Sequence, residues 1–320
     1  MKCINKKNVV VATLLCSILF MTGCTSNKDI VTTYEKAYHT QLYKDDCFAT
    51  DLCVANENVN LDSFRYNQGF KATALMDIQD NKVWLSNNVH KRLFPASTTK
   101  IITIHLALKY GNLEDIVTVS KTATLVPSDS SNADLQEGDV LTLNDLLYAT
   151  MLPSGNDAAV AVAEHISGSV SAFVDLMNKE AQKMGATNTH FTNPHGYHDE
   201  KHYTTAYDLY LMLNEAILDK TFCDIIHKKD YTTCISSRNG SRREVTWNQS
   251  NQFINGQRIV PNNVSVIGGK TGTTGKAGAC LVLYVKDDEG KDYIAILMGA
   301  DSRTYLYDCM TFLLSSIPKL

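Results

Sequence analysis

The pattern of apolar and polar positions along the chain predicts strands toward both ends and helices between them. Residues 71–80 and 83–88 are two strand-like runs that meet at a polar turn. Near the other end, residues 279–286 and 292–299 are rich in apolar and β-branched side chains and are separated by an acidic turn with a glycine. A last amphipathic helix is expected at about residues 302–315.

The middle of the chain is predicted to be mostly helical. Residues 97–110 follow Pro-Ala, have an apolar body and stop before glycine and asparagine, as a buried helix does. Thr142 and Asp145 have the spacing of a capping box. Helices are expected over residues 142–152, 158–166 and 172–184. The sequence therefore predicts an α+β fold, an antiparallel sheet flanked by helices, with an all-helical subdomain inserted at about residues 111–250.

The N-terminus has the composition of an export signal. Lysines precede a short apolar run, and Met21-Thr22-Gly23-Cys24 is similar to the lipobox of bacterial lipoproteins. We expect residues 1–23 to be a signal peptide, Cys24 to be lipidated, residues 24–50 to be a tether and residues 51–320 to be the catalytic domain. An ordinary cleaved signal peptide and an uncleaved anchor are the alternatives.

Composition narrows the possible partners. The 320 residues carry a formal net charge of −4 and no basic run, so nucleic acid is not an expected partner.

Export permits disulfides, and Cys47 with Cys53 and Cys223 with Cys234 are candidate local pairs. Two other cysteines, Cys280 and Cys309, are expected to be small buried apolar residues.

The first chemical motif is Ser97-Thr98-Thr99-Lys100. A serine hydroxyl is a weak nucleophile until a base takes its proton. A lysine one helical turn away can be that base if burial and neighbouring cations lower its pKa from about 10.4. The backbone N–H of Ser97 would form half of an oxyanion hole. By themselves, these residues also fit a capped surface helix with an exposed lysine.

The second motif, Ser154-Gly155-Asn156, lies at a break between two predicted helices. Such a break can direct both polar side chains into one cleft. The hydroxyl of Ser154 can pass a proton to a leaving amine, and the amide of Asn156 can bind a substrate amide. An ordinary turn with a helix cap has the same pattern.

The third motif is Lys270-Thr271-Gly272, which precedes Thr273. A strand edge flanked by glycines admits an extended peptide as an additional strand. Lys270 and Thr271 would then bind a terminal carboxylate, and the N–H of Thr273 would complete the oxyanion hole. A glycine-rich hairpin turn is the alternative.

A histidine cluster offers a different chemistry. His195, His198 and His202 lie close to Asp199 and Glu200 and could be a zinc site. Because the segment has loop composition, we favour a solvated loop with one functional histidine and expect neither metal nor other cofactor.

The three motifs in this order resemble the serine-type D-Ala-D-Ala carboxypeptidases, the low-molecular-mass penicillin-binding proteins of peptidase family S11. The resemblance covers about residues 51–315. It rests on residues 94–100 (FPASTTK), 154–158 (SGNDA), 191–196 (FTNPHG) and 269–273 (GKTGT).

The resemblance implies a β-lactamase/transpeptidase-like fold and a reaction. Ser97 would be acylated, with Lys100 as its base, and the terminal D-Ala would be removed from peptidoglycan stem peptides. β-Lactams would inhibit the enzyme. The N-terminal export signal implies that it acts at the outer face of the bacterial cytoplasmic membrane. The family's roles would fall on Ser154 as a catalytic group and on Asn156, Lys270, Thr271 and Thr273 as substrate-binding groups. His195 and Asp208 match a family segment near the site and are candidates for supporting deacylation.

The chain departs from the family pattern in two places. Tyr197 stands where the family often has Leu after His-Gly, which would alter the cleft wall. Many members also carry a second β-rich domain and a C-terminal anchor, whereas this sequence stops at Leu320. We expect an N-terminal lipid to replace that anchor.

Three other functions remain as alternatives. A class A β-lactamase shares the fold and motifs but typically has S-D-N and an E-x-x-L-N loop; position 155 here is Gly155 and no E-x-x-L-N occurs. A penicillin-recognising binding or sensory protein would not need the intact Ser97, Lys100 and Lys270. A zinc D,D-peptidase would use the histidine cluster instead.

Overall fold

The computed structural model describes residues 51–64 and 69–317. Residues 52–320 form one compact unit. The predicted signal peptide, Cys24, the tether and Cys47 lie outside the described residues, and those interpretations stay predictions.

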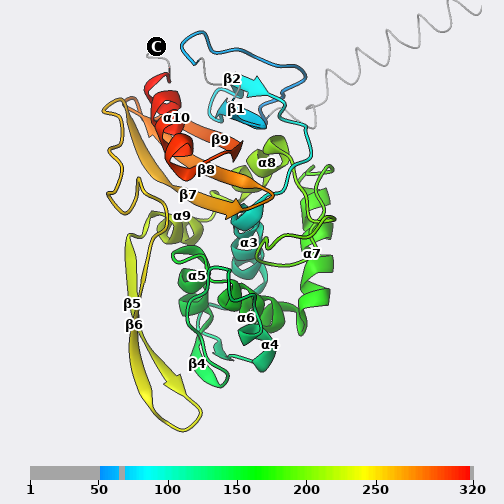
Figure 1. Cartoon of the computed structure of the whole chain (residues 1–320), viewed down its shortest axis with the longest axis vertical. Helices are drawn as coiled ribbons and strands as arrows, with labels where there is room; N and C mark the ends of the chain where they lie inside the picture. The colour runs from blue at the N-terminus through cyan, green and yellow to red at the C-terminus, as the bar shows by residue number, and fades with distance from the viewer. Residues whose placement is uncertain (1–50, 65–68, 318–320) are drawn as a thin grey trace, which may run out of the picture. The chain divides into compact units, whose positions relative to one another are not determined.

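A five-stranded antiparallel sheet brings the two ends of the unit together (Figure 1). Its strands are β1 (Ala72–Asp77), β2 (Lys82–Asn87), β7 (Val264–Thr274), β8 (Gly278–Asp287) and β9 (Asp292–Ala300), in the order β2-β1-β9-β8-β7. The two hairpins predicted from turn composition are confirmed. Because β1 pairs with β9, the N-terminal hairpin lies beside the C-terminal strands.

Both faces of this sheet are buried, and β9 shows why. Ile294 and Ile296 pack in the core shared with α3 (Lys100–Tyr110) and α8 (Ala206–Ala216). Ala295 and Leu297, one position along, pack in the core under α10 (Arg303–Ser315). Successive side chains of a strand point to opposite faces, so a run that is apolar throughout is covered on both sides. Figure 1 shows α10 over β8 and β9.

The insert between β2 and β7 holds most of the helices. They are α3, α4 (Lys121–Thr124), α5 (Leu143–Met151), α6 (Asn156–Ser167), α7 (Val170–Lys183), α8 and α9 (Lys220–His227). The capping box predicted at Thr142 and Asp145 is confirmed at the start of α5. This capped helix leads directly to the Ser154-Gly155-Asn156 break.

The insert is not all-helical, however, and this part of the prediction was wrong. A second antiparallel sheet has the order β3-β4-β5-β6. Its strands are β3 (Ile116–Thr118), β4 (Asp139–Thr142), β5 (Asp230–Ser237) and β6 (Arg242–Asn248). Every second residue of β5 and β6 is exposed over much of their length, so they lack the continuous apolar run of the first sheet. The pairing of β4 with β5 also joins segments far apart in sequence, which no local pattern reveals.

The predicted disulfide between Cys223 and Cys234 is absent, because both residues are free thiols. Cys223 lies on α9, where its thiol donates to the carbonyl oxygen of Ile217, whereas Cys234 is exposed on β5. Cys53 is also a free thiol, buried against the carbonyl oxygen of Asp77. As expected, Cys280 and Cys309 are buried in the two cores.

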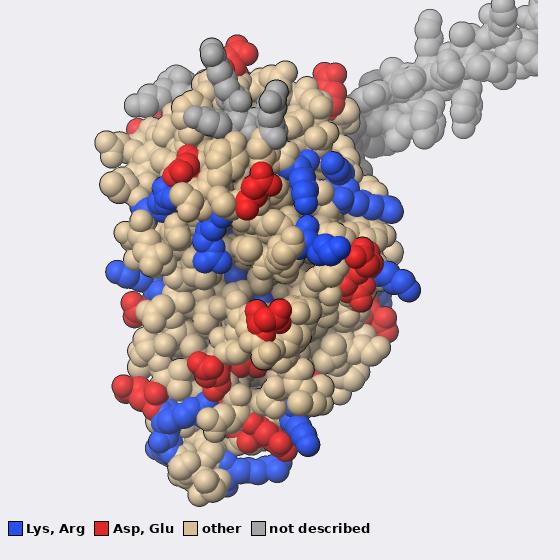
Figure 2. Space-filling model, in the orientation of Figure 1, with Lys and Arg blue, Asp and Glu red and all other residues tan. Residues whose placement is uncertain are grey.

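Acidic and basic side chains are interspersed on the face shown in Figure 2. Within the described ranges, no single helix has both the length and the apolar composition to cross a membrane; only α6 and α7 taken together, as a sharply bent pair, meet that test.

Candidate active site

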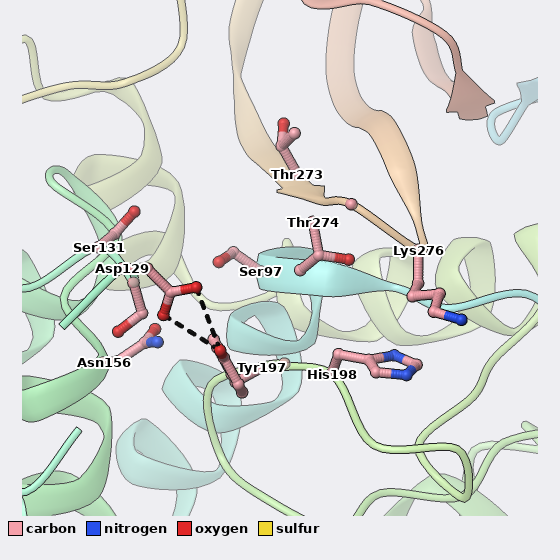
Figure 3. A pocket seen from close by; sticks show the side chains of 12 residues that line it. Ser97, Asp129, Ser131, Asn156, Tyr197, His198, Thr273, Thr274 and Lys276 are labelled. Atoms are coloured by element: carbon pink, nitrogen blue, oxygen red, sulfur yellow. Dashed lines mark hydrogen bonds between the residues drawn. The ribbon is translucent and has the colours of Figure 1, made fainter. Parts of the chain in front are cut away.

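A cavity of about 270 Å³ opens at Ser97, and several segments meet around it (Figure 3). One wall is the end of β7 and the following turn, residues 273–276. Facing it are the loop 129–131, the first residue of α6 and the loop 196–198. Ser97 of the first motif and Asn156 of the second therefore line one cleft, together with Thr273 directly after the third motif.

Ser97 lies on a strained turn rather than inside a regular helix. The predicted helix 97–110 begins as a short 3₁₀ turn, η2 (Ala96–Thr99), and becomes α-helical at Lys100. Ala96 has a positive φ of 50°, which is costly for a residue with a Cβ. The hydroxyl of Thr99 donates to the carbonyl oxygen of Ala96 over 2.9 Å and stabilises the turn.

Two glycines let other segments approach this turn closely. A Cβ on Gly272 of β7 would lie 2.8 Å from the carbonyl oxygen of Pro95 and 2.9 Å from the backbone nitrogen of Ser97. A Cβ on Gly196, where φ is +85°, would lie 1.8 Å from the carbonyl oxygen of Ala96. Since these contacts are all with backbone atoms, only glycine fits at either position.

Lys100 is fully buried and its Nζ reaches three segments. It donates to Asn156 Oδ1 at 2.6 Å and to the carbonyl oxygen of His195 at 2.9 Å, and lies 3.2 Å from Ser97 Oγ. The first two partners are carbonyl oxygens, which only accept. A neutral amine has two N–H groups and one lone pair, so with both N–H groups used the lone pair is left for the hydroxyl of Ser97.

The surroundings of Lys100 favour that neutral form. Burial, and then the nearby Lys270, hold the pKa of the Lys100 amine well below its ordinary value, against a weaker opposite effect of Asp157. Burial and Arg303 lower the pKa of Lys270 to about 7. The lowered pKa favours Lys100 as the base that accepts the proton of Ser97.

Ser154 and the third motif, Lys270-Thr271-Gly272, are more deeply buried than Ser97. Ser154 has a positive φ of 65°, and its hydroxyl is buried with no hydrogen-bond partner among the described residues. Lys270 is buried and donates to the carbonyl oxygen of Thr271, whose own hydroxyl lies 3.1 Å from Ser250 Oγ. Thr273 lines the cavity with Ser97. None of the hydrogen bonds within the described ranges joins Ser154, Lys270 or Thr271 to Ser97 or Lys100.

Asp157 is a structural residue to which the sequence analysis gave no role. Its buried carboxylate accepts from the backbone N–H groups of Ala133, Leu135 and Ala158, at 2.8–3.0 Å. These bonds fix the segment after the cavity-lining loop against the start of α6. An acid directly before the predicted helix 158–166 was the available signal.

The two residues expected to support deacylation lie in different environments from each other. The side chain of His195 accepts from the N–H of Tyr197, and burial lowers its pKa to about 3, so it stays neutral; its carbonyl oxygen, not its ring, contacts Lys100. Asp208 accepts from the hydroxyl of Thr189 and the N–H of Asn188 and is not part of the cavity lining.

The histidines of the candidate zinc cluster have separate partners. His202 Nδ1 accepts from the N–H of Thr192, so its Nε2 carries the hydrogen and donates to the hydroxyl of Thr99 at 2.9 Å. His198 instead pairs with Glu200. Over the residues that the structure describes, no group of three or more His, Cys, Asp or Glu side chains could bind a metal. His202 thus supports the nucleophile turn, a role that the sequence analysis missed.

Tyr197, noted above as a departure from the family, crosses the cleft. Its hydroxyl donates to both carboxylate oxygens of Asp129, at 3.1 and 3.3 Å, between the two loops that flank Ser97 (Figure 3). We call this pair the Tyr197–Asp129 clasp. Nothing in the sequence pointed to Asp129, because the contact joins loops far apart along the chain.

The family model described as D-alanyl-D-alanine carboxypeptidase matches residues 67–302. The chain belongs to this family. It is 34% identical over 235 residues to the D-alanyl-D-alanine carboxypeptidase DacF of Bacillus subtilis, covering 72% of this chain and 58% of that protein. It is also 34% identical over 239 residues to DacC of Escherichia coli, covering 72% and 56%. The match thus spans less than two thirds of these relatives' length.

Solved structures of related proteins confirm the fold class. The Streptomyces K15 DD-transpeptidase superposes with a TM-score of 0.72 at 28% identity, over 82% of this chain and 98% of that one. Penicillin-binding protein 5 of Haemophilus influenzae gives a TM-score of 0.67 at 30% identity, over 82% and 71%. The expected family and its α+β fold are therefore confirmed.

The close approach of β7 to the nucleophile turn can be tested with two alanines. Gly272→Ala must displace backbone of Pro95 or Ser97, so we expect a loss of several degrees in melting temperature and slower acylation by penicillin. Gly275→Ala adds the same methyl group just beyond the end of β7, where the space at its Cβ is open, and should melt like the wild type. Equal melting temperatures and acylation rates for Gly272→Ala and wild type would contradict the close packing.

Proposed function

We propose that this protein is a serine D-alanyl-D-alanine carboxypeptidase that removes the terminal D-Ala of peptidoglycan stem peptides through an acyl-enzyme on Ser97. The observation that carries the proposal is the arrangement around Lys100. Its amine is buried, donates to two carbonyl oxygens and lies 3.2 Å from Ser97 Oγ, so in its neutral form the lone pair is left for the Ser97 hydroxyl. Family membership supports the substrate class.

In the acylation step, Ser97 Oγ attacks the carbonyl carbon between the two D-alanines while its proton passes to Lys100. The N–H groups of Ser97 and Thr273 would stabilise the negative charge that develops on the carbonyl oxygen. Ser154, whose buried hydroxyl has no other partner among the described residues, would relay a proton: its hydroxyl gives its proton to the leaving amine and takes the one held by Lys100, which returns to the neutral form. The C–N bond breaks, D-Ala leaves, and water later hydrolyses the ester.

The substrate is proposed to bind along β7 with its terminal carboxylate at Lys270 and Thr271, and its amide at Asn156. An extended peptide can pair with the edge strand of the five-stranded sheet, because β7 has a neighbour, β8, on one side only. A bound carboxylate also favours the charged form of Lys270, whose pKa is about 7 without it.

The same acyl-enzyme would explain inhibition by β-lactams, which acylate the same serine. Rapid β-lactam hydrolysis is disfavoured because the described cavity lining holds no glutamate to activate water. The other alternative, a penicillin-recognising binding or sensory protein, is disfavoured because the groups needed for acylation are present around Ser97. We also propose that the protein is exported and attached to the outer face of the bacterial cytoplasmic membrane through a lipid on Cys24.

The peptidase activity is tested by measuring D-alanine released from a synthetic peptide that ends in D-Ala-D-Ala. Wild type should release one D-alanine per peptide, and Ser97→Ala should reduce the rate by at least about a thousandfold. Release at the wild-type rate by Ser97→Ala, or none by the wild type, would refute the proposal.

The role of Lys270 in lowering the pKa of Lys100 predicts a shifted pH profile. Lys100 is a base only when unprotonated, so acylation is lost as pH falls through its pKa. Lys270→Met removes one cause of the lowered pKa, so the acidic limb of the acylation rate should move to higher pH. A chromogenic cephalosporin measures this limb. Lys276→Met, which removes an exposed cation at the cavity mouth, should leave the limb in place; equal shifts in both variants would contradict the explanation.

The proposed lipid anchor predicts membrane fractionation. The wild type expressed in a Gram-positive host should sediment with membranes and carry a diacylglycerol mass on Cys24, whereas Cys24→Ser should be released or retain its signal peptide. An unlipidated Cys24 in the membrane fraction would indicate an uncleaved anchor instead.

A further inference from the structure

The cavity beside Ser97 extends away from the proposed carboxylate site. Its β7 wall consists of residues 273–276, whereas Lys270 and Thr271 precede that stretch and do not line it. Because a strand advances about 3.3 Å per residue, a peptide that pairs antiparallel with β7 and has its carboxylate at Lys270 would have its preceding residues alongside this wall. The cavity is thus placed to receive the part of the substrate that stays on the enzyme.

The charged groups of this cavity are divided between its two sides. Asp129 lies on one side of Ser97, and Lys276 lies on the other (Figure 3). None of the ion pairs among the described residues includes Asp129. Asp129 is the carboxylate of the described lining, and no lysine, arginine or histidine neutralises it through an ion pair.

The Tyr197–Asp129 clasp orients the Asp129 carboxylate and leaves part of its hydrogen-bond acceptor capacity unused. A carboxylate has about four lone-pair sites, and the single hydroxyl of Tyr197 supplies one hydrogen, shared between the two oxygens. Acceptor capacity therefore remains for a cationic donor. A leucine at position 197 could not form this bond, so the departure from the family pattern is what positions the charge.

We propose that Asp129, held by Tyr197, is a subsite for a protonated amine on the side chain of the residue that precedes D-Ala-D-Ala. The inference rests on the proposed function and specifies its substrate class as stem peptides with a diamino acid at that position. The opposite side of the cavity, with Lys276, repels such an amine and leaves the Asp129 side for it.

The test compares two peptides that differ only in that amine. Nα-acetyl-L-Lys-D-Ala-D-Ala has a free ε-amine, and Nα,Nε-diacetyl-L-Lys-D-Ala-D-Ala does not. We expect the wild type to prefer the free amine in kcat/KM by about three- to tenfold at low ionic strength, mainly through KM, because the pair is partly exposed. The preference should shrink as salt is added.

Three variants test whether the clasp causes the preference for the free amine. Asp129→Asn keeps an acceptor for Tyr197 but removes the charge, and should bring the ratio of the two kcat/KM values close to one. Tyr197→Phe should lower the ratio partway, because the carboxylate loses its orienting donor. Asp134→Asn makes the same charge change on the same loop outside the cavity lining, where asparagine tolerates the positive φ of 57°, and should keep the wild-type ratio.

Each failure has a distinct meaning. If the wild type hydrolyses both peptides equally, or if Asp129→Asn keeps the preference, the amine subsite is refuted while the peptidase stands. If Asp134→Asn loses the preference as fully as Asp129→Asn, a general charge effect replaces the subsite. If the wild type hydrolyses neither peptide, the proposed function itself fails.

Discussion

The burial of Lys100 is the constraint on which the site depends. An ammonium group taken out of water is costly unless an anion or several acceptors compensate. No ion pair of the described residues includes Lys100 or Lys270. The nearby acid, Asp157, uses its oxygens on backbone N–H groups. Burial and the nearby Lys270 therefore lower the pKa of Lys100, which favours the neutral amine, the base that a serine nucleophile needs.

The same side chain links the segments that form the cleft. Lys100 connects the nucleophile turn, the start of α6 and the loop of His195, so a shift in any of them changes its three contacts. The backbone is strained where these segments meet, at Ala96 and Ser154. Packing compensates for that strain, because β7 packs closely against the nucleophile turn at Gly272 and His202 forms a hydrogen bond with Thr99. We regard the strain as the cost of presenting Ser97 and Ser154 outside regular helices.

The sequence could predict the elements whose signals are local. The hairpins follow from turn composition, α5 from its capping box, and the shared cleft from the order of three motifs. The second sheet was missed because β4 finds its partner β5 only after the chain has passed through α5 to α9. The contact of Lys100 with His195 was missed because it uses a backbone carbonyl, which has no sequence signature. The Tyr197–Asp129 clasp needs two loops to be brought together by the fold.

The central claim is that this arrangement activates Ser97 for covalent chemistry. The most direct test is intact-mass spectrometry of residues 25–320 during incubation with benzylpenicillin. We expect a long-lived adduct of one drug mass that maps to Ser97 and disappears in Ser97→Ala. Intact protein with intact drug, or an adduct on another residue, would contradict it.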